Sequence, residues 1–122
     1  MPQRRLPLVN IAQLKSLEDS LGGETSMSRA FVSNYVDMWT GRFQRLSMAI
    51  VAEDLDDAIE AALSLSTSSH MVGAEQLEKS SAEVIASLRN GSLQQASLAL
   101  TSLRQCGDLT VTQLAEEYLK GA

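Results

Sequence analysis

The chain has 122 residues, 44% hydrophobic and 20% charged, which suits one folded domain with a single core. Its formal net charge of -5 argues against a nucleic-acid partner, because phosphate backbones require clustered Lys and Arg. The single cysteine excludes an internal disulfide and a zinc motif, and no apolar run approaches the roughly 20 residues that cross a membrane, so we expect a cytoplasmic protein without metal, cofactor or membrane contact.

The first two predicted helices follow from capping signals and from apolar residues spaced by threes and fours. Asn10 is a good N-cap for a short helix, which Gly22 and Gly23 end. Its apolar face contains Ile11, Leu14, Leu17 and Leu21. A long helix then begins near Ser26. Its apolar stripe contains Met27, Phe31, Val32, Tyr35, Val36, Trp39, Phe43, Leu46 and Ile50.

Three further helix signals follow. Asp54 is the predicted N-cap of a third helix that continues to Gly73. The residues expected on its inner face are Leu55, Ala58, Ile59, Ala62, Leu65, Ser69 and Val72. A fourth helix runs from about Ala74 to Arg89, and Ser92 is the predicted cap of a fifth. Short connections of this kind make successive helices antiparallel neighbours.

The last segment allows two interpretations, because its apolar residues stay in phase from Leu93 to Tyr118. Either one helix passes through Gly107 at a cost of about 1 kcal/mol, or residues 106–108 form a turn before a short terminal helix. We favour the turn. Cys106 is then expected to be a small core residue near a helix end.

Together these signals predict an all-α fold, an antiparallel up-down four-helix bundle with an additional short N-terminal helix. Residues 1–8 are expected to form a flexible tail, and residues 9–119 to form the bundle. Trp39 should lie in the core, because it falls in the middle of the longest apolar stripe. Core positions are also expected for the methionines Met27, Met38, Met48 and Met71.

Residues 61–74, AALSLSTSSHMVGA, contain small and apolar residues at characteristic spacings. The stretch resembles the motif helix of the histidine-containing phosphotransfer (HPt) family, A-H-x-L-K-G-S-S-x-x-x-G-A. The residues in register with that pattern are Ala62, Leu65, Ser68, Ser69, Gly73 and Ala74. The likeness extends over about residues 9–119, through a short leading helix, a long second helix and an acidic Asp54 before the motif. It implies an HPt-like bundle in a two-component phosphorelay, with a response-regulator receiver domain or a histidine kinase as partner.

The resemblance places Leu63 where the family carries its phosphorylated histidine. A leucine side chain has no lone pair with which to attack a phosphoryl group, whereas a neutral imidazole does. Ser66 occupies the family's lysine position and Thr67 its glycine position. We therefore expect Leu63 to be a degenerate phospho-acceptor position in a binding module that cannot relay phosphate and is not an enzyme.

Helical periodicity predicts that Leu63 points outward. At about 100° per residue, Leu63 lies roughly 120° from the middle of the apolar face. It shares its angular strip with the polar residues Asp56, Glu60, Thr67 and His70. The residues predicted to form a partner-binding surface are Leu63, Ser64, Ser66, Thr67 and His70. Alternatively, Leu63 packs under the N-terminal helix or a loop.

Two other functions remain open. His70, the only histidine, could be an acceptor at an unusual position, although a shift of two turns moves the acceptor by about 10 Å. The chain could also be a helical interaction or oligomerisation domain unrelated to phosphorelay, and the sequence leaves its oligomeric state open. The serines of the motif are expected to bond back to carbonyls one turn earlier. The carboxylates near Asp54 are expected to be a solvated helix start.

Overall fold

The computed structural model describes residues 8–119. Within that range it contains five α-helices, a terminal π-helical segment and no strand, which confirms the all-α prediction. The elements are α1 (Ile11–Ser20), α2 (Thr25–Val51), α3 (Leu55–Met71), α4 (Glu75–Arg89), α5 (Leu93–Gln113) and η1 (Leu114–Leu119). Of the predicted tail, only Leu8 lies among the described residues, and its half-buried side chain packs against the core.

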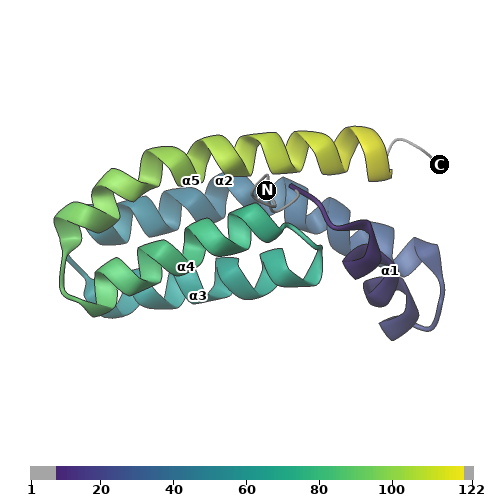
Figure 1. Cartoon of the computed structure of the whole chain (residues 1–122), viewed down its shortest axis with the longest axis horizontal. Coiled ribbons are helices and arrows are strands. Elements are labelled where there is room, and N and C mark those ends of the chain that lie inside the picture. Colours follow the sequence, from purple (N-terminus) through teal and green to yellow (C-terminus); the bar gives the residue numbers. More distant parts are fainter. Residues whose placement is uncertain (1–7, 120–122) are drawn as a thin grey trace, which may run out of the picture.

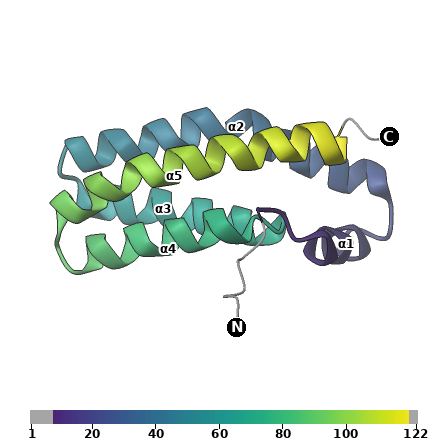
Figure 2. The ribbon, with the colours of Figure 1, turned by 45° about the horizontal axis from the view of Figure 1, so that its top comes forward.

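Helices α2 to α5 lie side by side, and successive helices run in opposite directions (Figures 1 and 2). α2 and α4 each pack against both α3 and α5, so that α3 and α5 lie diagonally opposite each other. The links between these helices are short, at residues 52–54, 72–74 and 90–92. α1 lies beyond one end of this group and contacts α2 and α3. The outer side of α3 is therefore left without a neighbouring helix.

Three of the helix starts are fixed by the predicted caps. The side chains of Asn10, Asp54 and Ser92 each accept a hydrogen bond from a backbone N–H two or three residues later, at 2.9 to 3.2 Å. These bonds satisfy N–H groups that have no partner inside the helix. The beginnings of α1, α3 and α5 are consequently set by local sequence.

Gly73 joins the turn between α3 and α4 to the start of α1. Its φ angle is 76°, a left-handed conformation that favours glycine. The N–H of Asn10 donates to the carbonyl of Gly73 at 2.7 Å. A Cβ at Gly73 would lie 2.5 Å from the carbonyl oxygen of Asn10, which is closer than non-bonded atoms approach. A glycine at this position of the motif therefore allows α1 to dock.

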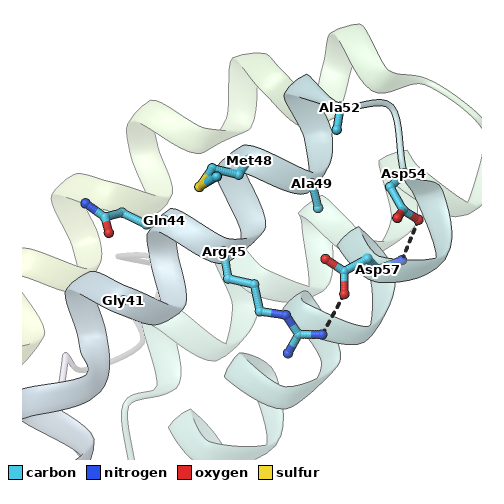
Figure 3. Close-up of a pocket in the computed structure, with 8 residues that line it drawn as sticks. All are labelled: Gly41, Gln44, Arg45, Met48, Ala49, Ala52, Asp54 and Asp57. Atoms are coloured by element: carbon cyan, nitrogen blue, oxygen red, sulfur yellow. Dashed lines mark hydrogen bonds and ion pairs between the residues drawn. The ribbon is translucent and has the colours of Figure 1, made fainter.

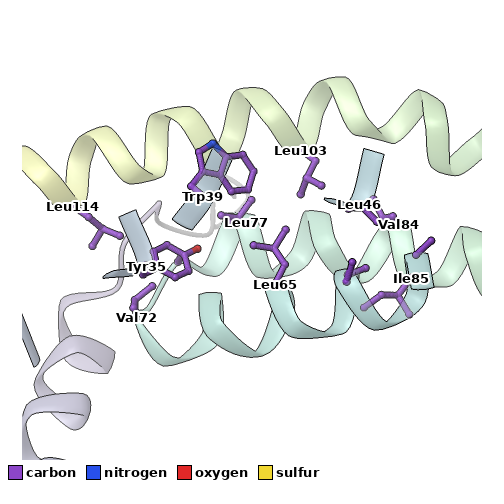
Figure 4. Close-up of a cluster of buried hydrophobic side chains, with 14 of the residues drawn as sticks. Tyr35, Trp39, Leu46, Leu65, Val72, Leu77, Val84, Ile85, Leu103 and Leu114 are labelled. Carbon is purple, nitrogen blue, oxygen red and sulfur yellow. The ribbon is translucent and has the colours of Figure 1, made fainter. Parts of the chain in front are cut away.

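The core is formed mainly by large side chains from α2 to α5, with contributions from α1 and η1 (Figure 4). Its most deeply buried leucines include Leu14, Leu46, Leu65, Leu77, Leu88, Leu103 and Leu114. Tyr35 is also buried, and its hydroxyl lies within hydrogen-bonding distance of the Ser69 hydroxyl, at 2.7 Å. Burial raises the pKa of Tyr35 to about 12, so its phenol stays protonated at neutral pH. The hydroxyls of Tyr35 and Ser69 thus satisfy each other inside the core.

The predicted turn at residues 106–108 is wrong, because α5 continues through Gly107. Gly107 is buried against the indole ring of Trp39, and a Cβ at this position would overlap that ring. The indole N–H donates to Asp108 Oδ1 at 2.8 Å. Glycine therefore serves here as a space for Trp39 and not as a helix breaker. Cys106 is accordingly half-buried within α5 and not near a helix end.

The expectation that four methionines fill the core is also wrong. Their exposed fractions are 52% for Met27, 42% for Met38, 71% for Met48 and 37% for Met71. At the start of α2 the interior position belongs to Ser28, whose hydroxyl lies 2.7 Å from that of Tyr118. One residue is a 100° rotation about a helix axis, so burial of Ser28 turns Met27 outward.

Replacing Gly107 by alanine tests the contact with Trp39. We expect Gly107→Ala to destabilise the fold by about 1 to 3 kcal/mol, because the new methyl group must displace the indole ring. Gly41→Ala is the matched control, since Gly41 lies within α2 and a Cβ there meets no atom within 4 Å. That control should be neutral or stabilising by up to about 1 kcal/mol. Urea unfolding measures both, and equal effects of the two variants would contradict the packing role of Gly107.

Candidate functional site

Leu63 points outward from α3, as the periodicity predicts. The buried residues of α3 are Ala58, Ala61, Ala62, Leu65 and Ser69. Leu63 is 41% exposed, whereas Leu65 is 1% exposed. The alternative in which Leu63 packs beneath the N-terminal helix or a loop is therefore wrong. Its angular neighbours Asp56, Glu60, Thr67 and His70 are all exposed, so Leu63 is an apolar side chain in a polar strip.

Arg42 of α2 reaches the side of this strip that faces α2. Its Nη1 donates to Ser68 Oγ at 2.7 Å and, at 3.4 Å, to Ser64 Oγ. Ser68 Oγ in turn donates to the carbonyl of Ser64 at 2.9 Å, which is the bond back to the preceding turn that the sequence predicts. Arg42 therefore brings a positive charge to the α2 side of α3, next to Ser64 and Ser68. The sequence motif did not reveal it, because Arg42 lies on another helix.

His70 faces the opposite neighbour, α4. Its Nδ1 lies 3.2 Å from Glu78 Oε1, and its side chain is 63% exposed. The two residues border a groove of about 420 Å³ that is also lined by Ser66, Glu75, Lys79 and Ala82. In this groove the carboxylates of Glu75 and Glu78 outnumber the ammonium group of Lys79, so the groove repels an approaching phosphoryl anion. The surroundings of His70 are thus poorly suited to accepting phosphate.

The predicted partner-binding surface is consequently divided along α3. Leu63, Ser64, Thr67 and His70 are exposed and Ser66 is half-buried. Ser64 contacts the arginine of α2, while His70 contacts the glutamate of α4. Leu63 and Thr67 occupy the strip between these two contacts. The five residues lie on one side of α3, but their polar neighbours come from two different helices.

The carboxylates at the start of α3 cap the helix and form ion pairs. Asp54 caps the helix, and the carboxylate of Asp57 pairs with Arg45 at 2.7 Å (Figure 3). Glu60 lies 3.9 Å from the same guanidinium. The pairs border an open groove of about 490 Å³ between the end of α2 and the start of α3. The partners of these carboxylates are thus the helix N-terminus and an arginine, as expected for exposed acidic residues at a helix start.

Residues 8–119 offer few other sites for chemistry. In this range no three His, Cys, Asp or Glu side chains come close enough together to hold a metal ion. None of the helices in the same range is both long and apolar enough to cross a lipid bilayer. Burial raises the pKa of the Cys106 thiol, which makes the thiolate scarcer at neutral pH.

The exposure of Leu63 predicts that it contributes little to folding. We expect Leu63→Ala to change the free energy of unfolding by no more than about 0.5 kcal/mol, as is usual for surface substitutions. Leu65→Ala, two residues along the same helix, should cost about 2 to 5 kcal/mol because it opens a cavity in the core. Chemical denaturation of both variants measures the difference. Comparable losses would show that Leu63 is part of the core.

Comparison with known proteins finds no protein-family model, no curated protein and no solved structure that the chain matches. The observations left for a functional assignment are therefore the spacing of small and apolar residues from Ala62 to Ala74 and the exposed side chain of Leu63.

Proposed function

We propose that this chain is an HPt-like module of a two-component phosphorelay that binds a receiver domain or a histidine kinase without relaying phosphate. In this proposal α2 to α5 are the antiparallel four-helix bundle of the family, and α1 is the additional short helix. The module is not an enzyme, and it acts in the cytoplasm. The observation that carries the proposal is the exposed Leu63, in register with the position of the family's phosphorylated histidine.

The distribution of matching and changed residues along α3 supports this assignment. Ala62, Leu65, Ser69 and Ala74 are matching residues, and each is at most 1% exposed. Gly73, also a match, makes the turn against which α1 docks. These residues hold α3 in place. In this proposal, these residues form the part of the HPt motif that positions the acceptor helix.

The residues that differ from the HPt pattern lie at least partly exposed to solvent, and they lack the groups that carry out phosphotransfer. Leu63 and Thr67 are exposed, and Ser66 is half-buried. Together they remove a nucleophilic imidazole, a lysine charge and a glycine from the positions that serve phosphotransfer in the family. None of the three replacements disturbs the core. A domain altered in this way keeps its shape and loses the acceptor.

An exposed leucine can still support association. Full burial of a leucine side chain is worth about 1.5 to 3 kcal/mol, and Leu63 has less than half of its surface available. The gain from this one contact is therefore on the order of 1 kcal/mol before ordering costs. Thr67 extends the same exposed strip one turn further along α3. Loss of phosphotransfer thus does not require loss of binding.

The active-acceptor alternative fits the structure less well, because Glu78 contacts His70 and the two lie on the α4 side of the strip. The interaction-domain alternative draws on other exposed apolar side chains, such as Val51 at 80% and Leu98 at 71%, but these lie on two different helices. Both alternatives predict different outcomes from the proposal when the chain meets a phosphorylated receiver.

The test combines binding and phosphotransfer with a set of purified receiver domains. We expect at least one receiver to bind, and Leu63→Asp to weaken that binding by about 10-fold or more, because a charge would be buried in the contact. Leu98→Asp is the matched control, since Leu98 is 71% exposed on α5, and it should leave the affinity unchanged.

A radiolabelled phosphoreceiver should leave no acid-labile phosphate on the chain. Acid-labile phosphate that disappears in His70→Ala would instead support the active-acceptor alternative. Equal affinities of Leu63→Asp and Leu98→Asp would place the contact elsewhere on the molecule and contradict the proposed surface.

A further inference from the structure

Arg42 is a cation that the described part of the protein does not neutralise. Within residues 8–119 it forms no ion pair, and its partners are the hydroxyls of Ser64 and Ser68. Its Nε is buried and has no hydrogen-bond partner. Hydroxyl oxygens carry no net charge, so they satisfy individual N–H groups without balancing the guanidinium charge. The neighbouring Arg45 differs, because Asp57 and Glu60 accompany it.

A groove gives access to this guanidinium. It measures about 340 Å³, lies between α2 and α3, and is lined by Asp37, Met38, Gly41, Arg42, Arg45 and Ser64. A Cβ added at Gly41 would meet nothing within 4 Å, so the α2 side of the groove is open. Asp37 is the only acidic residue that lines it, against two arginines. Because Arg45 is already paired with Asp57, Arg42 is the guanidinium of this groove that forms no ion pair among residues 8–119.

The groove is lined by the residue that comes directly after the degenerate acceptor position in the chain. Ser64 lines the groove and follows Leu63 in the chain. The hydroxyl of Ser64 accepts a long hydrogen bond from Arg42, at 3.4 Å, and within residues 8–119 it donates to no acceptor, so its hydrogen can meet an anion. An anion in the groove could thus receive hydrogen bonds from the guanidinium and from this hydroxyl.

We propose that Arg42 and Ser64 bind the phosphoryl group of a phosphorylated partner without accepting it. The inference rests on the proposed function for the identity of the partner, and it adds that the module distinguishes the phosphorylated partner from the unphosphorylated one. Arg42 then supplies a positive charge from α2, whereas Ser66 borders the other groove, on the α4 side. Guanidinium groups suit this task, because their planar N–H fork matches phosphoryl oxygens and keeps its charge.

Inorganic phosphate is the first probe, because it needs no receiver domain. We expect phosphate to shift the NMR signals of the Arg42 side chain and of the Ser64 and Ser68 amides saturably, with a midpoint in the millimolar range. Chloride at equal ionic strength controls for screening. Acetate tests for a carboxylate site, and it should bind at least about 10-fold more weakly than phosphate, because it carries less charge and fewer acceptor oxygens.

Matched variants separate this site from general electrostatics. Arg42→Gln should weaken phosphate binding about 10-fold or more, and Ser64→Ala should weaken it measurably without removing the arginine. Arg89→Gln removes the same charge from the exposed end of α4 and should leave phosphate binding unchanged. If Arg42→Gln does not fold, Ser64→Ala and Arg42→Lys decide the question, because the lysine keeps the charge but loses the fork.

Several outcomes would overturn the inference: no saturable shift at Arg42, equal effects of Arg42→Gln and Arg89→Gln, or acetate binding as tightly as phosphate. The second probe is a receiver domain treated with beryllofluoride to mimic phosphorylation. The treated form should bind the wild-type chain more tightly than the untreated form, and Arg42→Gln should abolish the difference. A receiver that binds equally in both forms contradicts this inference alone, whereas failure of every receiver to bind contradicts the proposed function.

Discussion

The close approach of α2 and α5 at Trp39 and Gly107 is the constraint on which the arrangement depends. Any side chain at position 107 of α5 would overlap the indole ring of Trp39. The indole N–H also donates a hydrogen bond to Asp108, which is likewise on α5. With α5 held against α2, α4 packs against both α5 and α3, and α3 lies diagonally opposite α5. Only α2 and α4 then flank α3 along its length. One side of α3 is thereby left to solvent, and Leu63 lies on it.

Under the proposed function, the residues of α3 that match the HPt pattern and those that depart from it differ in burial. The matching residues Ala62, Leu65 and Ser69 face the core, Gly73 and Ala74 make the turn before α4, and Ser68 is half-buried beside Arg42. Of the residues that depart from the pattern, Leu63 and Thr67 are exposed and Ser66 is half-buried. The exposed side is further divided between a cationic edge at Arg42 and an edge at His70 and Glu78. A partner that docks over Leu63 would face Arg42 on the α2 side, and His70 with Glu78 on the α4 side. The two edges give the proposed surface a polarity that residue 63 alone does not provide.

The features that the sequence predicted correctly are those set by neighbouring residues. Caps such as Asn10 and Asp54 act within one helical turn, and the outward position of Leu63 follows from the helical period. The features that it missed depend on residues distant in the chain. Gly107 looks like a helix breaker until Trp39 is placed beside it, and burial of Ser28 in preference to Met27 depends on Tyr118. Arg42 and Glu78 joined the site from α2 and α4, and periodicity within α3 carries no signal for either.

The central claim is that the scaffold still presents residue 63 as an HPt domain presents its histidine, so that only the chemistry has been lost. The most direct measurement is phosphotransfer from a radiolabelled phosphoreceiver to the folded triple variant Leu63→His, Ser66→Lys, Thr67→Gly. The account predicts acid-labile phosphate on this variant and none on the wild-type chain, because the imidazole, the charge and the glycine return to an intact frame. A triple variant that folds, binds the receiver and still gains no phosphate would contradict the claim.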